Sequence, residues 1–105
     1  MANSVGYHEP FEKLDPVTTD LHRALTSLQE ELEAVDWYRQ RAVACTDVEL
    51  RTILEHNMRE EIEHAAMVLE WIRRREPAFD KHLRTFLFTS GPITEIEHAH
   101  EPDAE

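Results

Sequence analysis

The sequence has few glycines, one cysteine and no long apolar run, and each shortage excludes a class of structure. Two glycines in 105 residues leave little of the turn chemistry that a β-sandwich needs. The single cysteine, Cys45, allows no internal disulfide, which fits a reducing cytoplasm. No apolar stretch approaches the roughly 18 residues of a membrane-spanning helix, and the N-terminus does not resemble a signal peptide. We therefore expect a soluble all-α protein.

Basic residues are scarce as well: the sequence has 11 Lys and Arg against 22 Asp and Glu, which gives a formal net charge of −11. A surface this negative repels the phosphates of nucleic acids and of anionic lipids, so we expect neither nucleic acid nor membrane as a partner. The length is that of a single domain.

Two long segments carry apolar residues at helical spacing and predict an antiparallel helical hairpin. The first, at about residues 16–44, follows Asp15, an N-cap residue placed before a proline. The second, at about residues 47–75, begins with a capping box of Thr46 and Glu49 and ends before Pro77. Because only a few residues near Cys45 join the segments, the helices must pack against each other in opposite directions.

A shorter helix and an acidic tail complete the expected domain. Residues 1–14, before the hairpin, show no helical period and are expected to be loosely ordered. After the hairpin, apolar spacing predicts a third helix at about residues 78–88. Beyond Gly91 the apolar period is lost, which predicts a brief turn of helix and then a disordered acidic tail over residues 97–105. The helical domain is therefore expected to span residues 1–96.

Large apolar side chains on more than one face predict an oligomer. Trp37 points about 180° away from the apolar stripe of its helix, and Met67 and Trp71 lie roughly 120° or more from theirs. Side chains of this size on separate faces need more than one packing partner. The simplest arrangement is a dimer in which two hairpins form a ferritin-like four-helix bundle.

Glu31, Glu61 and His64 form the candidate metal site. Glu-x-x-His places a carboxylate and an imidazole on one helix face. Glu31 lies fifteen residues before Thr46 and Glu61 fifteen after it, so in an antiparallel hairpin both stand ~22 Å from the turn. Di-metal carboxylate bundles use one Glu from each of two helices and a Glu-x-x-His from each of the other two. One chain offers half of that set, and a dimer would complete it.

The motif alone is weak, because this composition predicts about one Glu-x-x-His by chance and three occur. The pairs Glu95/His98 and Glu97/His100 lie in the expected tail and count as noise. Near the apolar stripes, however, unneutralised carboxylates would cost several kcal/mol per ion, so protons or a metal must neutralise them. Oxygen-rich ligation with one imidazole suits iron or manganese. The alternative is that the two glutamates are solvated and His64 has no metal role.

Other residues close to Glu31 along the first helix are weaker candidates for a role at the metal site. Tyr38 lies on the same side as Glu31 and could orient a ligand, although a core aromatic explains it as well. Glu30, Glu33 and Trp37 share the opposite face of the helix. They could attract cations, although charged stripes are usually only solvated.

The motifs Glu30-Glu31-Leu32-Glu33-Ala34-Val35-Asp36-Trp37-Tyr38 and Glu60-Glu61-Ile62-Glu63-His64-Ala65-Ala66-Met67 resemble those of the encapsulated ferritins. The segment from His82 to Thr94 is similar to the end of that family's fold, and the resemblance runs over about residues 8–96. It implies a half-ferritin whose dimers form a di-iron ferroxidase centre and associate into a ring, expected to be a decamer. The family's members are cargo of a cytoplasmic encapsulin nanocompartment that stores the iron mineral.

The resemblance also implies a role for each candidate residue. Glu31, Glu61 and His64 from both chains would bind two irons per dimer, with Glu61 bridging them. Glu30 and Glu33 would attract iron toward the centre with Trp37 beside them, and Tyr38, like Trp37, would support the centre without binding metal. No stretch before Glu105 resembles the short peptide by which the family docks into its shell.

Two alternatives to a ferroxidase remain open from the sequence. One is a non-catalytic helical dimer that binds zinc or another divalent ion structurally. The other is a metal-free interaction module whose acids serve solubility. A rubrerythrin-like peroxidase is disfavoured because the sequence carries no cysteine-rich electron-transfer module.

Overall fold

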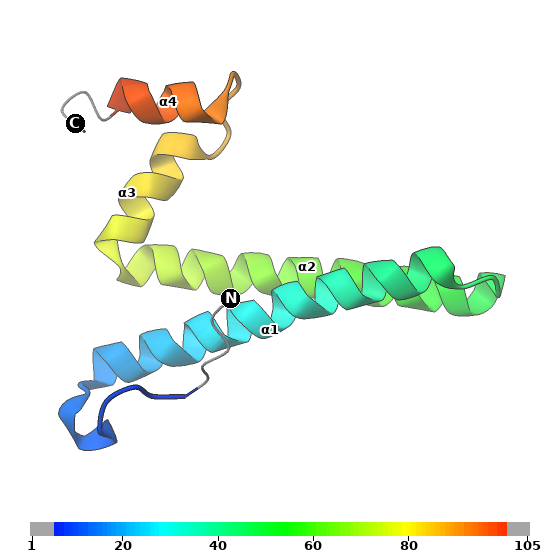
Figure 1. The fold of residues 1–105 in the computed structure, drawn as a ribbon, viewed down its shortest axis with the longest axis horizontal. Coiled ribbons are helices and arrows are strands. Elements are labelled where there is room, and N and C mark those ends of the chain that lie inside the picture. The colour runs from blue at the N-terminus through cyan, green and yellow to red at the C-terminus, as the bar shows by residue number, and fades with distance from the viewer. Residues whose placement is uncertain (1–5, 101–105) are drawn as a thin grey trace.

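The computed structural model describes residues 6–100, all of whose regular structure is helical (Figure 1). A 3-10 helix, η1 (Phe11–Lys13), precedes two long helices, α1 (Pro16–Ala44) and α2 (Val48–Arg75), and two short ones follow, α3 (Pro77–Phe86) and α4 (Ile93–His100). The long helices pack side by side as an antiparallel hairpin, and α3 and α4 form an arm that rises from the far end of α2. The expected all-α hairpin with a short C-terminal helix is confirmed, and the arm adds a second short helix.

The start of α1 agrees with the sequence, whereas α2 is capped by a different residue. The carboxylate of Asp15 accepts a hydrogen bond from the backbone N–H of Thr18 at 2.7 Å, with proline at the first helical position. The capping box of Thr46 and Glu49 was wrong, because Asp47 is the N-cap of α2 and accepts from the N–H of Leu50 at 2.8 Å. Aspartate caps a helix at least as well as threonine, and its position one residue later sets where α2 starts.

The third helix ends earlier than expected and the fourth extends further. Helix α3 stops at Phe86 because Leu87 is extended and Phe88 adopts a left-handed conformation, with φ of 63°. Helix α4 includes residues 97–100, so this part of the expected disordered tail is helical; the remainder, 101–105, lies outside the described residues. Glu95 in its first turn and histidines in its last turn complement the helix dipole, which an apolar period does not reveal.

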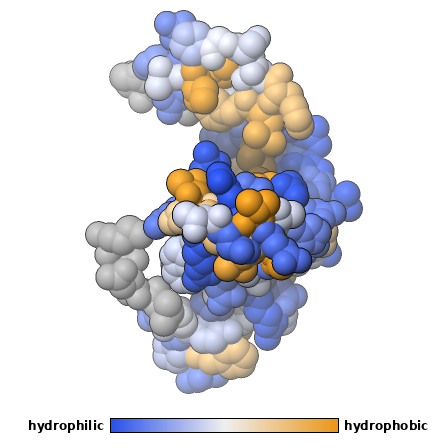
Figure 2. All heavy atoms as spheres, turned by 90° about the vertical axis from the view of Figure 1, so that its right-hand side faces the viewer, coloured by the Kyte–Doolittle hydropathy of each residue, from blue (hydrophilic) through white to orange (hydrophobic). Residues whose placement is uncertain are grey.

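The hairpin buries little of its own apolar surface. Among the described residues, the only buried apolar side chains are those of Ala42, Ala65 and Ile72, and Leu32 and Ile62 are about half exposed despite lying in the expected stripes. Figure 2, which looks onto the turn end of the hairpin, shows apolar side chains lying open there and on the arm above it. No helix in residues 6–100 combines the length and apolarity needed to cross a bilayer.

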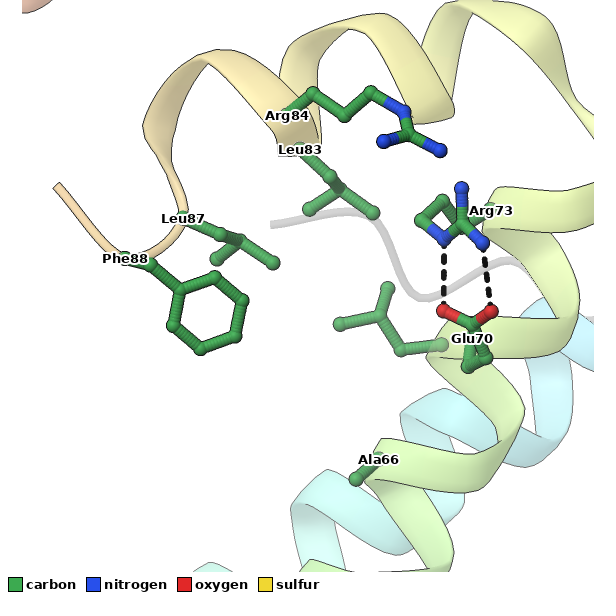
Figure 3. A pocket seen from close by; sticks show the side chains of 8 residues that line it. Ala66, Glu70, Arg73, Leu83, Arg84, Leu87 and Phe88 are labelled. Carbon is green, nitrogen blue, oxygen red and sulfur yellow. Dashed lines mark hydrogen bonds and ion pairs between the residues drawn. The ribbon is translucent and has the colours of Figure 1, made fainter.

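A cluster of ion pairs fixes the corner between α2 and α3. The guanidinium of Arg73 donates to both carboxylate oxygens of Glu70, at 2.7 and 2.8 Å, and also to Asp80 of α3. Arg84 donates to Asp80 at 2.9 Å, and Arg74 donates to Glu70 at 2.6 Å. The bidentate pair of Arg73 and Glu70, drawn in Figure 3, holds the guanidinium in a defined geometry. Because the same guanidinium also donates to Asp80, the cluster ties α3 to the end of α2.

This corner is expected to loosen in acid. Hydrogen bonds from Arg73 and Arg74 lower the pKa of Glu70 from 4.5 to about 2. Because the folded pKa is the lower one, the pair stabilises the fold fully above pH 4.5, and that contribution disappears as the pH falls from 4.5 toward 2. The thermal midpoint of Glu70→Gln should therefore lie below that of the wild type at pH 6 and converge with it near pH 2.

The difference should be small because the pair faces solvent. The matched control is Glu63→Gln, which removes an exposed carboxylate on the same helix. If Glu70→Gln and the wild type lose stability in parallel between pH 5 and pH 2, the corner cluster does not contribute in this way.

Candidate metal centre

The antiparallel hairpin brings Glu31, Glu61 and His64 together, as their distances from the turn predict. Glu31 comes from α1, and Glu61 and His64 lie one turn apart on α2. The Nδ1 atom of His64 is 3.5 Å from Oε1 of Glu61 and 3.7 Å from Oε2 of Glu31. One potential ligand atom from each residue lies within 4.8 Å of the other two, and within residues 6–100 no other trio of metal-ligating side chains is grouped in this way.

The carboxylates are more enclosed than the imidazole. The side chains of Glu31, Glu61 and His64 are 19%, 27% and 45% exposed. The Oε1 atom of Glu31 is fully buried and has no hydrogen-bond partner within the described part of the chain. A buried carboxylate oxygen without a partner is costly. A cation at this position would satisfy it, so the geometry favours a metal site over a solvated acidic stripe.

The three donor atoms fit a divalent or trivalent metal ion but do not complete its coordination sphere. A cation bonded to three atoms at about 2.1 Å would bring those atoms within about 4.2 Å of one another, so only small side-chain movements are needed. Two carboxylates and one imidazole suit iron, manganese or zinc. Three protein ligands leave open coordination positions, which solvent, a substrate or ligands from a second chain can occupy.

The other candidate residues lie on α1 and are not part of this group. Glu30 and Glu33 are exposed on α1, as is Trp37, which borders a shallow hollow of about 260 Å³. Tyr38 is half-buried, and the guanidinium of Arg41 stands over its ring, 5.5 Å from the centroid. An iron-attracting role for Glu30 and Glu33 and a supporting role for Trp37 and Tyr38 stay predictions.

His100 of the C-terminal Glu-x-x-His pairs and Arg73 at the end of α2 make contacts away from the metal site. In α4, the Nδ1 atom of His100 lies 3.0 Å from the carbonyl oxygen of Ile96, a contact within its own helix. Arg73 lies in the last turn of α2, where its charge complements the helix dipole, and it also joins Glu70 to Asp80 of the next helix. The spacing of three between Glu70 and Arg73 was a usable signal, but the contact with Asp80 depends on the angle of α3.

Comparison with known proteins shows consistent similarity over this part of the chain. The sequence pattern of the family described as EncFtn-like matches residues 6–90, which include all three clustered residues. The chain is 61% identical to the encapsulated ferritin-like protein of Rhodospirillum rubrum, over 92% of this chain and 69% of the relative. It is 33% identical to the encapsulin nanocompartment cargo protein EncC of Myxococcus xanthus, over 86% of this chain and 76% of the relative.

A solved structure has the same fold. The crystal structure of protein ne0167 from Nitrosomonas europaea superposes with a TM-score of 0.81 at 62% identity. The match covers 84% of this chain and 97% of that protein. At this identity the two chains share their helical architecture in detail.

Proposed function

This chain belongs to the EncFtn-like family of encapsulated ferritin-like proteins, and on that premise we propose that it is a ferroxidase. It would oxidise Fe²⁺ to Fe³⁺ with O₂ at a two-iron centre formed between two copies of the chain. The observation that carries the proposal is the cluster of Glu31, Glu61 and His64, in which one carboxylate oxygen is buried without a partner. A bound iron ion would resolve that unpaired buried charge.

The need for two copies follows from the number of ligands. A single chain contributes two carboxylates and one imidazole, which is half of the ligand set in di-metal four-helix bundles. A twofold axis beside the hairpin would bring a second set opposite the first, with each Glu61 able to bridge the two metals. The exposure of the His64 side chain, at 45% in one chain, supports an open side that a partner covers.

Each of the three clustered residues would have a defined role in the reaction. Fe²⁺ is the substrate, and two ions lose one electron each, which matches a two-electron reduction of O₂. The carboxylates of Glu31 and Glu61 would bind the ions and favour the ferric state, because hard oxygen ligands prefer the higher charge. His64 would complete the ligand set, and the coordination positions without protein ligands would admit oxygen.

The proposal also includes assembly beyond the dimer. The Rhodospirillum relative is described as encapsulated and the Myxococcus relative as encapsulin cargo. We extend this association to the present chain and propose that its dimers form a ring, expected to be a decamer, inside an encapsulin shell. The sparse core and the half-exposed stripe residues Leu32 and Ile62 support association of the hairpins.

Anaerobic iron titration followed by oxygen tests the proposed reaction. Metal-free protein should bind about two Fe²⁺ per pair of chains, and exposure to air should then oxidise both with consumption of O₂. Tight binding at this stoichiometry without oxygen consumption would mean that the site is a structural metal site. Absence of binding would favour a metal-free interaction module.

A further inference from the structure

Met67 is an exposed methionine on the helix that carries Glu61 and His64. It is 62% exposed, whereas Met58, the other methionine within residues 6–100, is half-buried. Methionine usually fills irregular gaps in apolar cores. Its thioether is oxidised to a sulfoxide when an oxidant reaches the sulfur, and the exposure of Met67 makes its sulfur available to such an oxidant.

The position of Met67 on α2 places it beside the candidate metal centre. Met67 follows His64 by three residues within the same helix. Residues three apart on a helix are neighbours, with Cβ atoms about 5–6 Å apart. Methionine side chains on helices lean toward the N-terminus, over the residues three and four positions earlier, which here are His64 and Glu63. The thioether of Met67 is therefore next to one of the three clustered ligands.

Two hollows in the surface meet at Met67. One, of about 490 Å³, lies between the two long helices, with Ala24 and Ser27 on the α1 side. The other, of about 670 Å³, lies along α2, and Trp71 borders both. A water molecule takes up only about 30 Å³ in the liquid, so a solute as small as hydrogen peroxide can reach Met67 through either hollow.

The proposed reaction forms an oxidant at this place, and the present inference rests on that reaction. Two Fe²⁺ ions give up one electron each, and these two electrons with two protons convert O₂ to hydrogen peroxide. Peroxide that leaves the centre is most concentrated beside the ligands, where Met67 lies. The thiol of Cys45 does not compete there, because Cys45 follows the end of α1, ~21 Å along the helix from Glu31.

Met58 provides a comparison within the same helix. It precedes Glu61 by three residues, so it is as close along the chain to a clustered ligand as Met67 is. At about 100° per residue, however, Met58 is turned by about 120° from His64 around α2, and Met67 by only about 60°. The side chain of Met58 is half-buried and leans toward the N-terminus of α2, away from Glu61. The two methionines therefore differ in their access to peroxide from the centre.

We propose that Met67 is a modification site at which hydrogen peroxide formed at the metal centre is captured. The thioether sulfur attacks one peroxide oxygen, so that an S–O bond forms and the O–O bond breaks. The sulfur loses two electrons and becomes a sulfoxide, and the second oxygen leaves as water with both protons. Each methionine consumes one peroxide, so the capture protects the ligands during the first turnovers and is renewed when a sulfoxide reductase restores the thioether.

Iron oxidation in the presence of catalase tests the capture. Each pair of copies receives two Fe²⁺ and then O₂, while catalase destroys peroxide in bulk solution but is too large to enter the hollows. Trypsin cleaves after Arg59, so the two methionines fall in separate peptides, and mass spectrometry with fragmentation measures the oxygen added to each. Sulfoxide at Met67 should exceed sulfoxide at Met58 about tenfold or more. When hydrogen peroxide is added in place of iron, catalase should prevent oxidation of both.

Met67→Leu, with Met58→Leu as its matched control, tests the consequence without catalase. Leucine is similar in size to methionine but has no sulfur, so both variants should oxidise iron at the wild-type rate. Met67→Leu should release nearly one peroxide for every two Fe²⁺ in the first turnover, and Met58→Leu as little as the wild type. Equal release by Met67→Leu and the wild type, or loss of the Met67 sulfoxide when catalase is present, would overturn this proposal alone. Absence of oxygen consumption by the wild type would contradict the proposed function and this proposal together.

Discussion

Glu61→Gln is expected to lower the rate of iron oxidation at least about 100-fold while the hairpin stays folded. Glutamine has the size of glutamate but no charge, so it binds iron poorly and cannot bridge two ions. Because both copies contribute to each centre, the substitution removes two ligands at once. Oxygen consumption after addition of Fe²⁺ measures the rate. Glu31→Gln and His64→Ala should have similar effects, since each removes one of the three clustered ligands.

The matched control is Glu60→Gln, which removes an exposed carboxylate from the adjacent position of α2. It should oxidise iron at nearly the wild-type rate. A variant with all three clustered residues changed to alanine that still oxidised Fe²⁺ like the wild type would rule out this centre.

The Glu31→Gln variant offers a second measurement that does not depend on activity. Oε1 of Glu31 is buried without a partner in the described chain, so removing the charge should make the metal-free protein no less stable than the wild type. A clear fall in the thermal midpoint of the metal-free variant would mean that the carboxylate is already satisfied without metal. Activity should therefore fall without a loss of stability, as expected for a residue retained for binding.

Metal binding is expected to drive association of the chain. Ligands from two copies bind the ions only in the associated state, so free metal at about 100 times its dissociation constant stabilises that state by about 2.7 kcal/mol per ion. Each ion should then strengthen pairing by about 100-fold, and two ions by about 10⁴-fold. Sedimentation of the metal-free protein with and without anaerobic Fe²⁺, over a series of dilutions, measures the shift.

The control for this experiment is Glu61→Gln, whose assembly should respond little to Fe²⁺. Zn²⁺, which does not change its oxidation state, should promote association of the wild type without any reaction with oxygen. Identical size distributions with and without metal at every concentration would show that the ligands do not come from two copies.

Much of the fold was predictable because helical spacing is a local property. Leucines at intervals of three and four residues predict α1, and Asp15 before a proline marks its start. The same regularity placed Glu31 and Glu61 at one height, because an antiparallel hairpin converts equal distances along the chain into proximity. The errors lie where competing local signals were close in strength, as with Asp47 against Thr46 at the start of α2.

The sequence by itself determined that the chain is all-helical, that its long helices form a hairpin, and which three side chains meet between them. These follow from periodicity, from a short connection and from residue spacing, all of which can be counted along the chain. Only the tertiary structure decided that, within residues 6–100, one oxygen of Glu31 is buried without a partner, and that Phe88 is left-handed with a fully exposed side chain. Both depend on the angle and depth at which helices pack, which arise from contacts between distant residues rather than from local preference.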